Sequence, residues 1–234
     1  MKTKILLSAI FLSTVSISYG QWTFTQLSEP KSTMGTASLG NIAYFAGGSN
    51  ADGAISAVEV YDVTTGEFEI WPDIFLARSG SGGVACGSKV FFGGGAISWD
   101  SFSSRVDIYD TLTQQWSADS FSIPRFLPSA VSYGNLVIFA GGLTDMYLNS
   151  TSIIEIYDIE SETWSTDNLS IERCCMASAV VGDLAIFAGG FVTQNNISDV
   201  VDIYNFSSET WSTATLSEPR AFCEATTVGN KVLI

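Results

Sequence analysis

The segment Leu136–Trp164, LVIFAGGLTDMYLNSTSIIEIYDIESETW, decides the fold of this chain. It opens with an apolar run that ends in the diglycine Gly141-Gly142, and such a run is typical of a strand buried on both faces. After a variable stretch, Ile154–Tyr157 places aliphatic side chains on one face of a strand and an acid plus a tyrosine on the other. Trp164 then begins another strand. The segment therefore predicts β-structure.

The same landmarks recur along the chain in one register. Diglycines stand 47 or 48 residues apart, at Gly47-Gly48, Gly94-Gly95, Gly141-Gly142 and Gly189-Gly190. A tyrosine with an acid or amide follows each of them, at Tyr61-Asp62, Tyr109-Asp110, Tyr157-Asp158 and Tyr204-Asn205. Six residues later comes an aromatic residue, Phe68, Trp116, Trp164 or Trp211. A basic residue begins each unit, at Lys31, Arg78, Arg125, Arg173 and Arg220. These landmarks define repeats 31–77, 78–124, 125–172 and 173–219 and a partial repeat 220–234.

Each repeat predicts four short antiparallel strands. A glycine followed by a polar residue, such as Gly134-Asn135, separates the first strand from the second and suits a type II′ hairpin turn. The apolar run is the second strand, the alternating segment the third, and the segment after the tryptophan the fourth. Helical periodicity is missing from residues 21–234, so the fold class is all-β.

Four-stranded units with a diglycine, Tyr-Asp and Trp resemble the kelch repeat, and the resemblance covers Trp22–Ile234. It implies a kelch-type β-propeller of four-stranded antiparallel blades, with four complete blades and a partial one. It also implies that Trp116, Trp164 and Trp211 pack between blades and that the basic residues bridge blades near the central channel: Arg78, Arg125, Arg173 and Arg220. We expect those arginines to be buried and to donate to a neighbouring blade, whereas Arg105 is out of register and expected in a variable loop. Phe68, Asn205 and Lys31 depart from the pattern mildly.

The two ends of the repeat array predict an open or incomplete ring. Trp22 precedes Lys31 by the nine residues that separate Trp211 from Arg220, so residues 22–30 are expected to form an outer, fourth strand. In kelch-like rings such a strand completes the last blade and removes sheet edges. Residues 220–234 encode barely two strands, which favours a stretch of a longer propeller.

Residues 1–20 have the pattern of a secretory signal peptide. Lys2 and Lys4 precede the apolar stretch Ile5–Ile17, and Ser18 and Gly20 place small residues before a cleavage site at Gln21. We expect residues 21–234 to be secreted, extracellular or in the cell envelope, without membrane insertion. An uncleaved anchor is the alternative.

Composition excludes several classes of function. The net charge of −14 argues against nucleic-acid partners, which need clustered Lys and Arg. The chain has no histidine, so it cannot build a Ser-His-Asp triad or a histidine copper site. Glu59, Asp107, Glu155 and Asp202 recur at the same place in every third strand, which indicates a structural or solvated position and not catalytic carboxylates. A calcium-like pattern over Gly48–Glu59 has glycine where aspartate is needed. We predict no catalytic residue, no metal and no cofactor.

The cysteines leave two alternatives open. Cys86, Cys174, Cys175 and Cys223 contain no metal-like spacing, and disulfides form in exported chains. Cys174 or Cys175 could pair with Cys223 because both positions lie early in first strands of adjacent blades. Buried free thiols are the other alternative.

The variable stretches between the diglycine and the tyrosine are the candidate binding residues. Loops held by a rigid ring commonly carry recognition, and these loops emerge on the same face as the connections between blades. Their candidates are Trp99, Asp100, Phe102, Asp145, Met146, Tyr147, Phe191, Gln194 and Asn195. We predict a non-catalytic scaffold that binds protein or glycan. The alternative is a carbohydrate-active kelch enzyme, similar to sialic-acid mutarotases or an oxidase, with its catalytic residues outside this segment.

Overall fold

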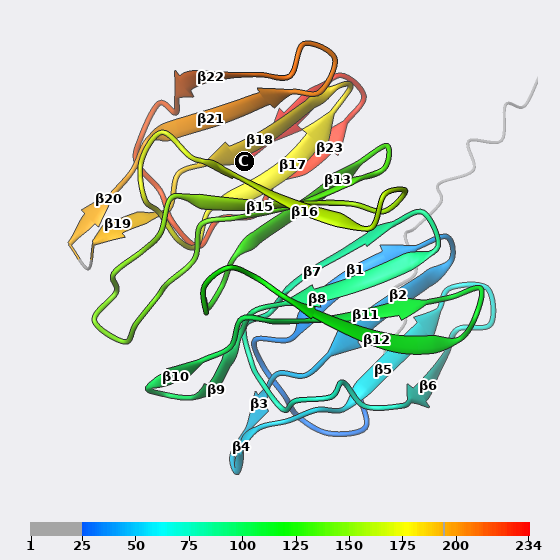
Figure 1. Cartoon of the computed structure of the whole chain (residues 1–234). Helices are drawn as coiled ribbons and strands as arrows, with labels where there is room; N and C mark the ends of the chain where they lie inside the picture. Colours follow the sequence, from blue (N-terminus) through cyan, green and yellow to red (C-terminus); the bar gives the residue numbers. More distant parts are fainter. Residues whose placement is uncertain (1–24, 194) are drawn as a thin grey trace, which may run out of the picture.

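The structure is a computed structural model that describes residues 25–193 and 195–234 (Figure 1). Within these ranges the chain forms strands and turns and no helix. The signal-peptide prediction for residues 1–20, Trp22 and Gln194 lie outside the described residues. The described ranges contain no helix long and apolar enough to cross a membrane.

Four sheets of four antiparallel strands, called blades 1 to 4, follow one another along the chain. Blade 1 holds β1 (Gly35–Leu39), β2 (Ile42–Ala46), β5 (Val58–Asp62) and β6 (Glu67–Trp71). Blade 2 holds β7 (Gly82–Cys86), β8 (Lys89–Gly93), β11 (Arg105–Asp110) and β12 (Gln115–Ser120). Blade 3 holds β13 (Ser129–Tyr133), β14 (Leu136–Ala140), β15 (Ile153–Asp158) and β16 (Thr163–Asn168). Blade 4 holds β17 (Ala177–Val181), β18 (Leu184–Ala188), β21 (Val200–Asn205) and β22 (Thr210–Thr215).

Short hairpins extend the connection between the second and third strands of three blades. They are β3 (Ser49–Asn50) with β4 (Gly53–Ala54), β9 (Ala96–Ser98) with β10 (Ser101–Phe102), and β19 (Phe191–Thr193) with β20 (Asn196–Ile197). Figure 1 shows all three projecting toward the same side of the molecule. A further two-stranded sheet, which follows blade 4 and which we call the fifth sheet, contains β23 (Thr226–Val228) and β24 (Lys231–Leu233). The predicted all-β fold with four complete blades and a partial one is confirmed.

The first strands of successive blades lie side by side and carry some of the hydrogen bonds that join the blades. Ser132 on β13 donates its hydroxyl to the carbonyl oxygen of Ala85 on β7 at 2.7 Å. Thr227 on β23 donates to Val180 on β17, also at 2.7 Å. Small side chains permit this approach: a Cβ at Gly83 would collide with the backbone of Thr36.

The hydrophobic core lies between the blades. One cluster joins Phe91 of blade 2 with Phe139 and Tyr157 of blade 3, and these side chains are buried. Equivalent clusters join blade 1 to blade 2 and blade 3 to blade 4. Full burial of one such aromatic side chain contributes about 1.5–3 kcal/mol. Each blade therefore depends on its neighbours for the burial of its faces.

Two turns explain the Gly-polar and Tyr-Asp motifs. Gly134, the first central residue of the β13–β14 turn, has a φ of 56°, as a type II′ turn requires. The aspartate of Tyr157-Asp158 accepts hydrogen bonds from the backbone N–H groups of Glu160 and Ser161 through Oδ1. Asn205 accepts the same pair of bonds through its amide oxygen. The change from Asp to Asn is mild because only one oxygen is used.

Two expectations about positions were wrong. Residues 25–30, the described part of the expected outer strand 22–30, form no strand. An outer strand pairs with the third strand of a blade, and the fifth sheet has only its first two strands in the described chain. Arg105 begins β11 and does not lie in a variable loop; its Nε is 2.9 Å from Asp107 Oδ1.

Candidate functional site

A buried ion pair occupies the same place in all four blades. The basic residue that begins each repeat meets the acid in the middle of the third strand, and both side chains are almost completely buried. The pairs are Lys31–Glu59 at 2.6 Å, Arg78–Asp107 at 2.5 Å, Arg125–Glu155 at 2.9 Å and Arg173–Asp202. A charge this deep is stable only when it is paired and hydrogen-bonded.

Each arginine joins two blades, but by a different route from the one expected. The side chain of Arg125 donates to the carbonyl oxygens of Ile153, at 2.8 Å, and Gly141, at 3.3 Å, and pairs with Glu155. All of these partners belong to the blade that Arg125 begins, so the expectation of a side-chain partner in a neighbouring blade was wrong. The backbone makes the connection instead, because the carbonyl oxygen of Arg125 accepts from the N–H of Gly95 in blade 2 at 2.8 Å.

The diglycine sterically permits this connection between blades. Gly141 has a φ of 63°, and a Cβ there would collide with the carbonyl oxygen of Arg173. Gly142 donates its N–H to that same oxygen at 3.0 Å. The motif is therefore structural.

The carboxylates of the ion pairs are occupied. Ser122 donates both its backbone N–H, at 2.8 Å, and its hydroxyl to Glu155 Oε1. Burial raises the pKa of Glu59, but hydrogen bonds from Lys31 and Ser28 outweigh it and hold that pKa below its ordinary value. Burial lowers the pKa of Arg125 to about 10 despite the nearby Glu155, which leaves the guanidinium protonated at neutral pH. These buried groups hold the blades in place; Nε of Arg125 and Nε of Arg173 have no hydrogen-bond partner in the described chain but are themselves buried.

The repeat tryptophans contact the preceding blade. Trp164 Nε1 donates to Asp119 Oδ2 of blade 2 at 2.8 Å, and Trp211 Nε1 donates to Asp167 Oδ2 of blade 3 at 2.7 Å. The corresponding position of blade 1 is Trp71, which packs on Tyr109 with ring centroids 4.7 Å apart. Trp116 Nε1 is consequently buried without a partner in the described chain.

The loop face carries a large hollow, which we call the loop groove. It has a volume of about 820 Å³ and spans blades 1 to 3. Apolar side chains dominate its lining: Ile97, Trp99, Phe102, Phe126, Leu143, Met146 and Leu148. Asp52, Asp145 and the serines Ser49, Ser79 and Ser98 supply polar atoms, and the described lining holds no basic residue. Trp99 is 71% exposed, which is exceptional for so large an apolar side chain.

Four of the predicted binding residues meet in the loop groove. Trp99 and Phe102 come from the β9–β10 hairpin of blade 2, while Asp145 and Met146 come from the loop between β14 and β15 of blade 3. The Asp145 carboxylate accepts hydrogen bonds from Tyr147 and Asn149, so it organises its own loop. These bonds lower the pKa of Asp145, the Asn149 side chain contributing most.

The other predicted residues do not line the loop groove. Asp100 lies in the β9–β10 turn, where it accepts a hydrogen bond from Ser98. Tyr147 lies in the blade 3 loop, and its side chain is 77% exposed. Phe191 and Asn195 belong to the hairpin region of blade 4, outside the groove. Whether any of these residues binds a ligand stays a prediction.

Sequence reasoning missed Phe126, the residue directly after the repeat arginine Arg125. It pairs with Leu143, directly after the diglycine, through hydrogen bonds of 2.8 Å in both directions. Its ring stacks on Phe102 with centroids 5.5 Å apart. The residue after the basic landmark pairs with the residue after the diglycine in each of the four blades, a regularity that only the structure shows.

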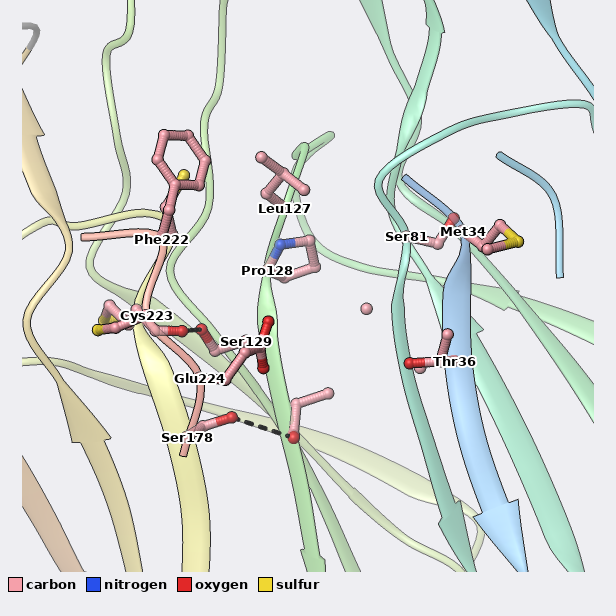
Figure 2. A pocket seen from close by; sticks show the side chains of 15 residues that line it. Met34, Thr36, Ser81, Leu127, Pro128, Ser129, Ser178, Phe222, Cys223 and Glu224 are labelled. Carbon is pink, nitrogen blue, oxygen red and sulfur yellow. Dashed lines mark hydrogen bonds between the residues drawn. The ribbon is translucent and has the colours of Figure 1, made fainter. Parts of the chain in front are cut away.

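A second cavity, the channel mouth, opens between the first strands. It has a volume of about 240 Å³ and small or hydroxyl side chains, including Thr36, Ser81, Ser129 and Ser178. Figure 2 shows these residues on opposite walls, with Phe222, Cys223 and Glu224 on the wall formed by the last repeat. The hydroxyls of Ser129 and Ser178 donate to the backbone carbonyls of Met176 and Ala130.

Metal ligands do not gather in the described chain. No group of three or more His, Cys, Asp or Glu residues there could hold a metal ion. Asn50 and Asp52 of the calcium-like stretch bond to each other, and Glu59 pairs with Lys31. All four cysteines are free thiols.

Comparison with known proteins agrees with this geometry. The kelch motif matches residues 124–166 and 172–215. The solved structure of YjhT superposes with a TM-score of 0.72 at 16% sequence identity, covering 87% of this chain and 76% of that one. No curated protein matches the sequence. The chain therefore contains two matched kelch motifs and has the fold of a kelch-type β-propeller.

Proposed function

We propose that this propeller is a non-catalytic binding protein that holds a basic and apolar segment of a partner protein in the loop groove. The observation that carries the proposal is the groove itself: a hollow of about 820 Å³ whose lining is mostly apolar, with Trp99 exposed at its edge. Specific sites combine such an apolar lining with a few polar groups.

The lining favours a protein segment over a glycan. Leucine, isoleucine, methionine and phenylalanine side chains bury apolar peptide side chains, and Trp and Met are enriched in protein interfaces. Polar atoms in the lining come from serines, backbone and two aspartates, one of which is committed to its loop. This lining offers more apolar surface than side-chain hydrogen-bond partners, which favours the peptide.

The charge favours a basic segment. The chain carries a net charge of −14, and Asp52 is an exposed acid at the groove. A cation can also lie over the exposed face of Trp99. Attraction to the acidic surface accelerates association at low ionic strength.

A binding role also agrees with the charges that recur in the repeats. The four recurring carboxylates are buried and paired with the basic residues that begin the repeats, so they are engaged in structural contacts. We place this binding protein outside the cytoplasm, as the pattern of residues 1–20 indicates. An intact mass of the exported protein that shows the loss of residues 1–20 would support this placement. A retained Met1 would contradict it.

The test selects peptides from a random displayed library on the wild-type chain, after depletion on a Trp99→Ala/Phe102→Ala variant. Calorimetry then measures the affinity of the selected peptides. We expect sequences with Lys or Arg beside apolar residues, an affinity that falls with salt, and a loss of about thirtyfold in Trp99→Ala, as for a hot-spot side chain.

Leu112→Ala is the matched control. Leu112 is 81% exposed, but it lies in the turn between β11 and β12 at the other end of blade 2. Its replacement should leave the affinity unchanged. Selected peptides that bind Trp99→Ala as well as wild type would refute the proposal, and so would a Trp99-dependent hit on a glycan array without any peptide hit.

A further inference from the structure

Two adjacent cysteines bring their sulfur atoms into contact at the start of blade 4. Cys174 Sγ and Cys175 Sγ are 3.4 Å apart. The pair follows Arg173, whose side chain is wholly buried and anchored by Asp202, Gly189 and Val200. Neither thiol takes part in the ion pairs or in the loop groove.

The backbone of both cysteines is fixed by the repeat. Cys174 exchanges two hydrogen bonds with Phe191, of 3.0 and 2.9 Å. Cys175 has a φ of 56°, as do Leu127 and Phe222 at the same repeat position within a few degrees. Its carbonyl oxygen accepts from the Phe222 N–H at 3.1 Å. The repeat therefore fixes the backbone from which the two sulfur atoms meet.

The two thiols differ in access and in acidity. Cys174 is 1% exposed, whereas Cys175 is half-buried and lines the channel mouth. The hydrogen bond from Cys175 lowers the pKa of Cys174 despite burial, with smaller contributions from Ser150 and Phe191. The same bond and burial raise the pKa of Cys175. One thiol can be reached from solvent, and the other is the better nucleophile beside it.

We propose that Cys174 and Cys175 form a redox-active dithiol that low-molecular-weight disulfides oxidise to a disulfide between the adjacent residues. Cys175 Sγ attacks one sulfur of the small disulfide RSSR, which releases one RSH carrying the Cys175 proton and leaves Cys175–S–S–R. Cys174 Sγ then attacks Cys175 Sγ and displaces the second RSH, which takes the Cys174 proton. The two thiols are oxidised, and RSSR is reduced to two RSH.

The product should be easy to reduce again. Adjacent Cα atoms are about 3.8 Å apart across a trans peptide, which is shorter than the usual separation of about 4.4–6.8 Å between bridged cysteines. Strained disulfides are the reducible, regulatory kind. Oxidation would change the conformation of the Cys174–Cys175 peptide. This peptide is hydrogen-bonded to Phe191 of the blade 4 hairpin on one side and to Phe222 at the channel mouth on the other.

Cys223 is the competing partner, because it also lines the channel mouth (Figure 2). It belongs to the next repeat, and no contact between its sulfur and either cysteine is present among the described residues. The sequence allows the two pairings to be separated, since trypsin cleaves after Arg173, Arg220 and Lys231. Residues 174–220 then carry both adjacent cysteines, and residues 221–231 carry Cys223 alone.

The test treats the folded chain with 4,4′-dithiodipyridine and follows thiopyridone release by absorbance. It then alkylates remaining thiols and maps the tryptic peptides by mass spectrometry. We expect two thiopyridones per chain from the adjacent pair and one more from Cys223, an unalkylated peptide 174–220 lighter by two hydrogens, and a mixed disulfide on peptide 221–231. Mild reduction with dithiothreitol should restore two alkylatable thiols on peptide 174–220.

Two variants provide the controls. Cys174→Ser should release one thiopyridone fewer than wild type and retain the mixed disulfide on Cys175, whereas Cys223→Ser should also release one fewer but leave the disulfide within peptide 174–220 unchanged. A retained mixed disulfide on wild-type peptide 174–220, or a cross-link between that peptide and 221–231, would overturn the proposal. The wild-type map alone decides this, so the result does not depend on the folding of either variant.

Discussion

Replacement of Arg125 by alanine tests the buried ion pairs most directly. Arg125 is wholly buried, and its removal leaves Glu155, 2% exposed, without its cation. The carbonyl oxygen of Gly141 also loses the Arg125 donor, and that of Ile153 keeps the N–H of Gly141, at 3.1 Å. Removal of one partner from a buried pair costs about 3–5 kcal/mol, and each buried acceptor left unpaired adds to that cost. We therefore expect the free energy of unfolding to fall by about 3–5 kcal/mol.

Lys89→Ala is the matched control because Lys89 also forms an ion pair, with an acid in the turn between β15 and β16. Its Nζ lies 2.7 Å from Glu162 Oε1, but the Glu162 side chain is 66% exposed. Exposed ion pairs contribute about 0–1 kcal/mol, so this variant should remain close to wild type. Arg105 is unsuitable as a control, since it shares Asp107 with Arg78.

The assay is urea denaturation followed by tryptophan fluorescence, with the slope of the transition compared between variants. Arg125→Lys should lose less than Arg125→Ala, because a lysine performs this role in the Lys31–Glu59 pair. The double variant Arg125→Met/Glu155→Leu should recover part of the loss, since it removes both charges together. Equal losses in Arg125→Ala and Lys89→Ala would refute the reasoning.

Three further predictions follow from single contacts. Trp164→Phe should lower the free energy of unfolding by about 1–2 kcal/mol because it removes the bond to Asp119, whereas Trp116→Phe should cost less, since its Nε1 has no partner; urea denaturation of both compares them. Gly141→Ala should cost well over the roughly 1–2 kcal/mol expected for Gly134→Ala, because both have positive φ but only Gly141 would also meet the Arg173 carbonyl; equal thermal midpoints would contradict this. Glu59 has a lowered pKa in the folded chain, so its stabilisation is present at neutral pH and is lost as the pH falls through that pKa; Glu59→Gln should be less stable at pH 7 and show a smaller loss on acidification below about pH 4 than wild type.

The sequence was sufficient for the fold because each landmark performs one local task in every repeat. Gly141-Gly142 permits the approach of the next arginine, Asp158 closes a turn, and Trp164 covers the preceding blade. Departures from the pattern were harder to interpret. Arg105 is out of register, yet it pairs with Asp107 of the buried ion pair in blade 2. It lies over the ring of Phe75, which stands where blade 3 has Ser122, the serine that donates to the Glu155 carboxylate.

The loop groove was predictable only in part because it is composite. Variable loops were recognisable by their break from the repeat, which identified Trp99, Phe102 and Met146. Phe126 comes from the connection between blades, and its place in the groove depends on the packing of two blades against each other. Asp145 was recognised as a loop residue, but its use of both oxygens within the loop depends on backbone geometry that spacing does not show.

Stability and recognition are separated within each repeat. The charged and aromatic landmarks that recur are buried between blades, so a change at Arg125 or Trp164 acts on the ring. The side chains that differ from blade to blade are exposed on hairpins whose ends are fixed by diglycine and arginine; Trp99, 71% exposed, is the clearest of them. Replacement of an exposed loop side chain leaves these buried contacts intact, and surface changes of this kind alter stability by only about 0.5 kcal/mol. The loop face can therefore change its partner by substitution without loss of the fold, which is the property expected of a binding scaffold and explains why the repeat alone does not identify the ligand.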